Sequence, residues 1–80
     1  MIKYYIVDRA TGEKKKTTKE DFFTILIFNL DEAVKSGSYT TYEALCSLKF
    51  LMNQGAKRKK FSSIAEVKTN GFVYQVEANT

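Results

Sequence analysis

Apolar residues recur at helical spacing in two neighbouring segments of the chain, residues 18–36 and 41–54. Apolar positions spaced three and four residues apart share one side of a helix, which predicts a helix packed against a core. In the first segment this stripe consists of Phe22, Leu26, Leu30 and Ala33. In the second segment it consists of Thr41, Leu45, Leu48 and Met52, with Ala44 and Leu51 beside it.

The ends of both helices carry recognisable signals. A Thr-x-x-Glu sequence occurs at residues 17–20 and again at 40–43. It can form a capping box, in which the threonine hydroxyl and the glutamate carboxylate each accept from a free backbone N–H. Gly37 and Gly55 follow the apolar stretches, and glycine readily adopts the left-handed conformation that ends a helix. The short linker between the segments predicts an antiparallel helical hairpin.

Residues 22–29 also fit a second interpretation. Their Phe, Ile and Leu side chains have high β propensity, so they could form a buried strand followed by a short helix from about Leu30. The capping sequence and the acidic residues Glu20 and Asp21 suit the N-terminus of a helix instead. The helix is the favoured interpretation.

The N-terminal residues 2–8 alternate loosely and predict a strand. One face would carry Ile2, Tyr4 and Ile6, and the other Lys3, Tyr5 and Val7. Residues 9–13 contain a Thr-Gly pair and predict a turn. Residues 14–16 either return as a second strand or lead directly into the first helix.

The C-terminal segments 64–69 and 72–78 flank Asn70-Gly71, a strong two-residue hairpin signal. This turn places Val67 opposite Tyr74. The predicted buried face consists of Ala65, Val67, Thr69, Phe72, Tyr74 and Val76. The whole chain, residues 1–80, therefore predicts a single small α+β domain of order β-α-α-β-β. Its antiparallel sheet has three strands, or four if residues 14–16 pair, and packs on the helical hairpin.

The composition limits the chemistry that the chain can perform. It contains no histidine, the commonest general base and metal ligand, and a single cysteine, Cys46. Its glycines are isolated, so the sequence has no glycine-rich phosphate loop. We therefore expect no enzyme, no metal and no cofactor. The lack of paired cysteines favours the cytoplasm, and no apolar stretch is long enough to predict a membrane span.

Basic residues are the most informative group, and they give the chain a net charge of +4. They gather in two clusters, Lys14, Lys15, Lys16 and Lys19 before the first helix and Lys57, Arg58, Lys59 and Lys60 after the second. An antiparallel hairpin places the start of its first helix and the end of its second at one pole, where the clusters are expected to meet. Concentrated positive charge suits an anionic partner, and we expect nucleic acid or a nucleoprotein complex.

A helical hairpin followed by a β-hairpin is also the outline of a winged helix-turn-helix. Residues 41–54 would then read the major groove, and residues 69–72 would form the tip of the wing. The outer face of that helix (Glu43, Ser47, Phe50 and Gln54) contains no arginine. Its Glu43 would face phosphate, and the usual first helix of that fold is missing, so a winged helix-turn-helix is not the favoured interpretation.

A second kind of surface is predicted from apolar residues. Tyr5, Val7 and Val73 are expected on the outer face of the sheet, and Phe50 on the outer face of the second helix. Aromatic and apolar patches are typical of protein interfaces. The alternative function is therefore a protein-protein inhibitor or adaptor that binds a host protein. The first helix is apolar on nearly all sides, so either the sheet and the second helix flank it, or a second subunit covers it in a homodimer.

Lysine outnumbers arginine eleven to two, which is the skew that AT-rich coding produces. Together with the small size of the chain, this skew favours a low-GC bacterium or one of its phages or plasmids as the source, and a phage or another mobile element is the source that we expect. Small phage proteins that block host nucleases, anti-CRISPR proteins among them, are often single α+β domains of this size. By this analogy of size and composition, the alternative function includes an anti-CRISPR-like inhibitor of a host nuclease complex.

Overall fold

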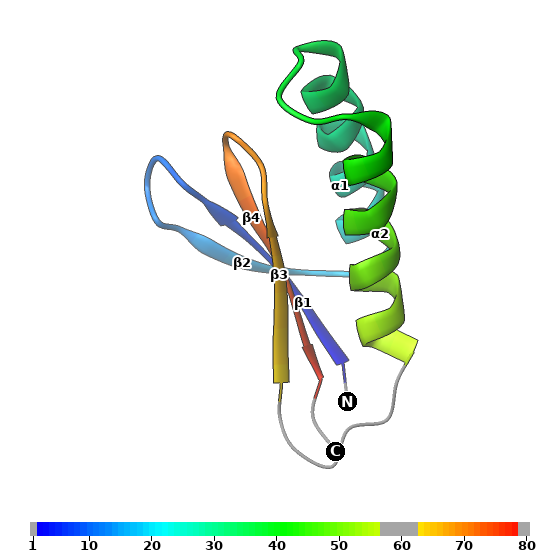
Figure 1. The fold of residues 1–80 in the computed structure, drawn as a ribbon. Coiled ribbons are helices and arrows are strands. Elements are labelled where there is room, and N and C mark those ends of the chain that lie inside the picture. Colours follow the sequence, from blue (N-terminus) through cyan, green and yellow to red (C-terminus); the bar gives the residue numbers. More distant parts are fainter. Residues whose placement is uncertain (1, 57–62, 79–80) are drawn as a thin grey trace.

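The computed structural model describes residues 2–56 and 63–78 and shows an α+β fold (Figure 1). Its elements are β1 (Ile2–Asp8), β2 (Lys14–Thr17), α1 (Lys19–Lys35), α2 (Thr41–Ala56), β3 (Ser63–Lys68) and β4 (Phe72–Ala78). The described strands form an antiparallel sheet of order β2-β1-β4-β3, with both helices over the same face. The predicted fold class is confirmed, and β2 supplies the fourth strand. The alternative strand at residues 22–29 is wrong, because those residues lie within α1.

The two faces of the sheet follow from the alternation of side chains along each strand. Tyr4 of β1 lies opposite Val76 of β4, which in turn lies opposite Ala65 of β3. All three are buried. Their neighbours in sequence point to the other side of the sheet, as the predicted alternation requires.

The predicted register of the C-terminal hairpin is confirmed. The Thr69 N–H donates to the Phe72 carbonyl at 2.8 Å beside the Asn-Gly turn. Val67 lies opposite Tyr74 further along the strands. Within the predicted buried set, Phe72 alone is partly exposed. A shift of one residue would turn this set to solvent, so burial fixes the register.

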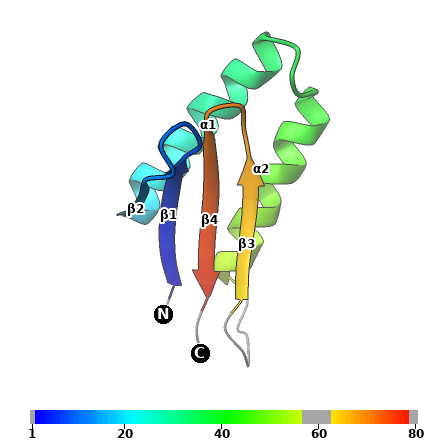
Figure 2. The same ribbon diagram turned by 90° about the vertical axis from the view of Figure 1, so that its left-hand side faces the viewer.

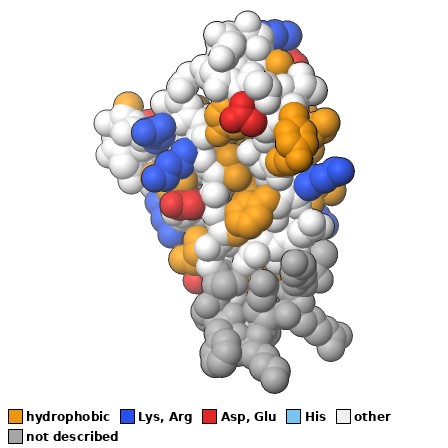
Figure 3. Space-filling view, viewed as in Figure 1, with side chains coloured by type: hydrophobic (Ala, Val, Ile, Leu, Met, Phe, Trp, Pro, Cys, Tyr) orange, Lys and Arg blue, Asp and Glu red, His pale blue; other side chains and the backbone are white. Residues whose placement is uncertain are grey.

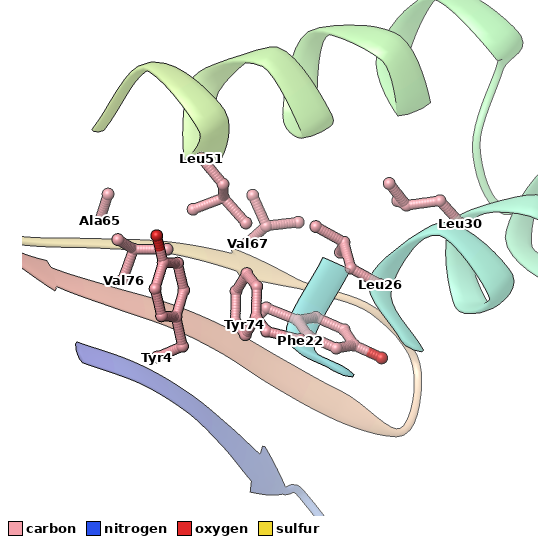
Figure 4. Close-up of a cluster of buried hydrophobic side chains, with 9 residues drawn as sticks. All are labelled: Tyr4, Phe22, Leu26, Leu30, Leu51, Ala65, Val67, Tyr74 and Val76. Carbon is pink, nitrogen blue, oxygen red and sulfur yellow. The ribbon is translucent and has the colours of Figure 1, made fainter. Parts of the chain in front are cut away.

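The core lies between the sheet and the helices (Figure 4). Phe22 is fully buried, and its ring centroid lies 5.2 Å from that of Tyr4 and 5.8 Å from that of Tyr74. The Asn29 side-chain amide donates to the Tyr74 hydroxyl, so this buried phenol keeps a polar partner. Burial raises the pKa of Tyr74, against the opposing effect of hydrogen bonds with Asn29 and Thr69.

The first helix buries the predicted stripe but begins one residue later than its capping sequence suggests. Its buried residues are Phe22, Leu26, Leu30 and Ala33. The N-cap is Thr18, whose hydroxyl accepts from the Asp21 N–H at 3.2 Å. Thr17 does not fill that position, because it pairs with Tyr4 at the end of β2. The strand therefore takes the first threonine and leaves the second to cap the helix.

A glycine closes α1, as predicted. Gly37 has a φ of 83°, a conformation in which a side chain would be strained. Its N–H donates to the Val34 carbonyl at 3.1 Å, and the Ser38 N–H donates to the Ala33 carbonyl at 2.9 Å. These are the two hydrogen bonds of a Schellman motif.

The second capping box is confirmed. The Thr40 N–H donates to Glu43 Oε1 at 3.0 Å, and the Glu43 N–H donates to Thr40 Oγ1 at 3.1 Å. The helix runs to Ala56, one residue past Gly55. Helix boundaries commonly differ by this much, so the predicted extent is close to the observed one.

The second helix is rotated relative to the predicted stripe. Leu51 is fully buried, whereas Leu45 and Met52 are each 53% exposed. Ala44 and Leu48 pack against the core beside Leu51. This orientation arises because α2 faces the sheet, and Leu51 joins a cluster with residues of β3 and β4.

The second capping box makes stability depend on the charge of Glu43. Hydrogen bonds from the Thr40 backbone and with its side chain lower the pKa of Glu43. Because the folded state favours the charged form of Glu43, this carboxylate stabilises the fold at pH values above its pKa in the unfolded chain. The contribution is lost as the pH falls through its pKa in the folded state. We expect the stability difference between wild type and Glu43→Gln, measured by urea unfolding, to shrink below about pH 4.5. A difference that stayed constant down to about pH 3 would contradict this interpretation.

Candidate functional site

The helices leave one face of the sheet uncovered. Figure 2 looks onto this face, with both helices behind the strands. Tyr5 and Val7 of β1 and Val73 of β4 lie on it, together with Lys14 and Lys16 of β2. The structure therefore joins two lysines of the predicted basic cluster to three residues of the predicted apolar interface. We call this surface the open face.

Cross-strand pairing arranges the open face in rows. One row, from β2 to β3, consists of Lys14, Val7, Val73 and Lys68. The next consists of Lys16, Tyr5, Gln75 and Glu66. Side chains directly opposite one another on a sheet have Cβ atoms about 5 Å apart, so each row is continuous. Both rows begin with a lysine at the β2 edge, continue through two uncharged side chains and end on a charged residue of β3.

Tyr5 and Lys14 are in direct contact. The Lys14 ammonium lies 4.3 Å from the centroid of the Tyr5 ring, within the range of a cation–π interaction. Lys16 lies directly opposite Tyr5 on the neighbouring strand. An aromatic ring beside two lysines of the neighbouring strand can contact a planar apolar group and an anion at the same time.

Lys15 and Lys19 lie away from the open face. Lys15 is opposite Ile6, on the side of the sheet that the helices cover, with its ammonium 3.9 Å from the Glu13 carboxylate. Lys19 is the first residue of α1 and lines a groove between the helices. Both lysines are exposed, so they extend positive charge around the β2 edge.

The second basic cluster (Lys57, Arg58, Lys59 and Lys60) lies outside the described residues. Its meeting with the first cluster therefore stays a prediction. The described chain shows that α2 ends, at Ala56, at the end of the helical hairpin where α1 begins (Figure 1). This is the arrangement on which that prediction depends.

Phe50 does not belong to the open face. It lies on α2, on the other side of the sheet, and is 51% exposed. Figure 3 shows hydrophobic side chains exposed over the helical side of the molecule and a group of basic side chains on the sheet side, with further basic side chains over the helices. The predicted apolar interface is thus divided between two surfaces.

Lys3 and Lys68 also lie on the open face, although neither belongs to the predicted basic clusters. Lys3 precedes the buried Tyr4 and therefore points outward, so its position on the open face could be predicted from the period-two alternation of the strand. The rest depends on strand order. Because β1 pairs with β4 and β4 with β3, residues far apart in sequence come to share one surface.

Acidic residues limit where positive charge accumulates on the open face. Glu77 lies opposite Lys3, and Glu66 lies opposite Gln75. Gln75 Nε2 donates to Glu66 Oε2 at 3.0 Å, whereas Gln75 Oε1 is buried without a hydrogen-bond partner. The acids belong to β3 and β4, so the net positive charge is greatest beside β2 and β1.

Within the described ranges, no group of three or more His, Cys, Asp or Glu side chains is placed to hold a metal ion. Neither described helix has the length and apolar character needed to cross a bilayer. The sequence of α2 contains one basic residue, Lys49. The interpretation that this helix reads a major groove stays a prediction. No protein-family model, curated protein or solved structure matches the chain.

Proposed function

We propose that this protein is a non-enzymatic binding module for single-stranded nucleic acid, free or within a nucleoprotein complex. The observation that carries the proposal is that Tyr5 lies directly opposite Lys16 on the open face and that its ring contacts the Lys14 ammonium. The cytoplasm is the proposed compartment, supported by the absence of cysteine pairs. The lysine-rich composition supports a phage or another mobile element as the source.

Single strands expose their bases, and proteins bind them by stacking bases on aromatic rings and neutralising phosphates with cations. A four-stranded sheet with an open aromatic face is one recurring platform for such contacts. Here Tyr5 offers a ring for one base, and Lys14 and Lys16 offer charges for the adjoining phosphates. The paired bases of a duplex cannot stack on this ring, so single strands should bind more tightly.

The first test is a salt titration of binding to labelled single-stranded and duplex DNA and RNA. If about three phosphates are neutralised, the log–log slope on single strands should be near −2. The double variant Lys14→Gln/Lys16→Gln should reduce that slope by about 1.4 and weaken binding at low salt about tenfold or more. Its matched control, Lys35→Gln/Lys49→Gln, removes the same charge from the helical layer and should change binding far less.

Tyr5→Ala tests the aromatic contact separately from the charge. Loss of one stacked base should weaken single-strand binding by about 1–3 kcal/mol, with the salt slope unchanged. Tyr5→Phe keeps the ring and should retain most of the affinity. Equal binding by Tyr5→Ala and wild type would overturn the stacking contact. No binding by the wild type even at low salt would overturn the proposed function.

A second candidate function uses the same surface. Tyr5, Val7 and Val73 form a continuous apolar centre on the open face, which also suits a protein partner such as a host nuclease complex. An inhibitor or adaptor acting there would lose its partner on Tyr5→Ala but would respond weakly to salt. Pull-down from host lysate at about 0.5 M salt, where phosphate contacts are screened, distinguishes the two functions.

A further inference from the structure

The two edges of the sheet differ in charge. β2 carries Lys14, Lys15 and Lys16 and would repel a second copy of itself, as protected sheet edges do. β3, at the other edge, places Glu66 and Lys68 on the same face. When a second copy of this strand pairs with it antiparallel, Glu66 of each copy can lie opposite Lys68 of the other.

Pairing with β4 leaves one set of β3 backbone groups directed outward. Antiparallel strands exchange hydrogen bonds at every second residue pair, and the Thr69–Phe72 bond sets the phase in this hairpin. Val67, two residues before Thr69, therefore directs its N–H and C=O toward β4. The N–H and C=O groups of Glu66 and Lys68 point to the open edge.

A two-fold axis at Val67 satisfies both the backbone and the charges. In this register Val67 faces its own copy on the helical side, and each Glu66 faces Lys68 of the second copy on the open face. An axis at Glu66 would instead place two carboxylates opposite each other. An axis at Ala65 would pair Glu66 with Ile64 and form no ion pair.

The helical side of such a junction would be covered by Phe50. Leu51 packs over Val67 in the core, and Phe50 lies about 100° away around the helix. The opposite flank of α2 carries Leu45 and Met52, which line grooves facing α1. Phe50 therefore lies on the flank of α2 that faces away from α1, on the side of the β3 edge, and is 51% exposed.

We infer that the β3 edge is a self-association site, at which two copies of this chain join antiparallel and form one continuous sheet. The Phe50 rings close the helical side of the junction. Two Glu66–Lys68 pairs close the other side. The dimer leaves both open faces exposed, so it is compatible with the proposed function and does not depend on it.

Existing hydrogen bonds at this edge leave room for the second copy. The Tyr39 hydroxyl donates to the Lys68 carbonyl, but Tyr39 packs against the core and so approaches from the helical side. A carbonyl oxygen accepts two hydrogen bonds, and the second can come from Glu66 of the other copy. On the open face, Gln75 occupies only Oε2 of Glu66, which leaves Oε1 for the lysine.

The test is sedimentation velocity of the purified full chain over roughly 1 µM to 1 mM. One short strand and one ring from each copy form a small contact, so we expect a dimer with a Kd in the micromolar range. Glu66→Pro removes an outward N–H without removing a bond to β4 and should be monomeric, with a native circular dichroism spectrum. A dimer that persisted in folded Glu66→Pro would overturn the inference.

A second test exchanges the charges of Glu66 and Lys68 and does not depend on the introduction of a proline. Glu66→Lys alone and Lys68→Glu alone each place like charges opposite and should each raise the dimer Kd about tenfold. The double variant Glu66→Lys/Lys68→Glu restores both pairs and should return the Kd to within about threefold of wild type. Rescue of this kind requires the two residues to face each other across the interface.

Two other results would also overturn the inference. One is a wild type that remains monomeric over the whole concentration range. The other is a dimer disrupted by Ile27→Lys, in the groove between α1 and α2, and unaffected by the charge changes on β3. Because the samples contain no nucleic acid, these outcomes are independent of whether the open face binds it.

Discussion

Replacing Phe22 with alanine is expected to lower the free energy of unfolding by about 3–5 kcal/mol. The Phe22 side chain is fully buried, and its ring contacts those of Tyr4, Phe23 and Tyr74. Truncation would remove these contacts and leave a cavity between α1 and the sheet. A domain of this size has a total stability of only about 4–12 kcal/mol, so the variant should be partly unfolded.

The matched control is Phe28→Ala on the same helix. Phe28 is 65% exposed, so its truncation should change the unfolding free energy by less than about 0.5 kcal/mol. Urea unfolding followed by circular dichroism measures both variants. Similar losses of stability in the two variants would mean that the helix is rotated or covered differently from the fold described above.

Local features of this fold could be predicted from the sequence because they depend on neighbouring residues. The Asn70-Gly71 turn sets the register of its hairpin, and Thr40 with Glu43 sets the start of α2. The buried stripe of α1 follows from its helical spacing. In each case the physical signal is contained within about ten residues of the chain.

Features that depend on distant residues could not be predicted in the same way. The stripe predicted for α2 centres on Leu45 and Met52, yet Leu51 is the buried residue. All three are apolar, so composition alone does not show which flank meets the sheet. Thr17 and Thr18 present a similar choice, which is decided by the pairing of Thr17 with Tyr4.

The candidate site shows the same division. Alternation places Tyr5 and Val7 on one side of β1, and the basic character of residues 14–16 is evident from the sequence. Their union on the open face depends on β2 pairing beside β1, which the sequence leaves undecided. The same pairing sends Lys15 to the other side of the sheet. A charge cluster in sequence is thus divided by the pleat into two surfaces.

Val76→Lys and Gln75→Lys are adjacent substitutions in β4 with opposite expected outcomes. Val76 is fully buried between Tyr4 and Ala65 of the neighbouring strands. A lysine there would bury a charge without a partner, at a cost of about 3–5 kcal/mol. We expect Val76→Lys to lose its cooperative unfolding transition in urea.

Gln75→Lys should fold and should strengthen nucleic-acid binding. Gln75 faces the open side, and its buried Oε1 has no partner, so the substitution removes an unsatisfied acceptor. The expected change in stability is within about 0.5 kcal/mol. The added charge lies beside Tyr5 and should steepen the salt slope on single strands by about 0.7.

Together, Val76→Lys and Gln75→Lys distinguish an incorrect fold from an incorrect proposed function. If Gln75→Lys unfolds and Val76→Lys does not, the assignment of the two faces is wrong. If Gln75→Lys folds but binds no better, Glu66 is the first explanation, because its carboxylate accepts from Gln75 and would pair with the new lysine. The double variant Gln75→Lys/Glu66→Gln removes that pairing. Unchanged affinity in this folded double variant would show that phosphates do not bind along the Tyr5 row, while leaving the fold intact.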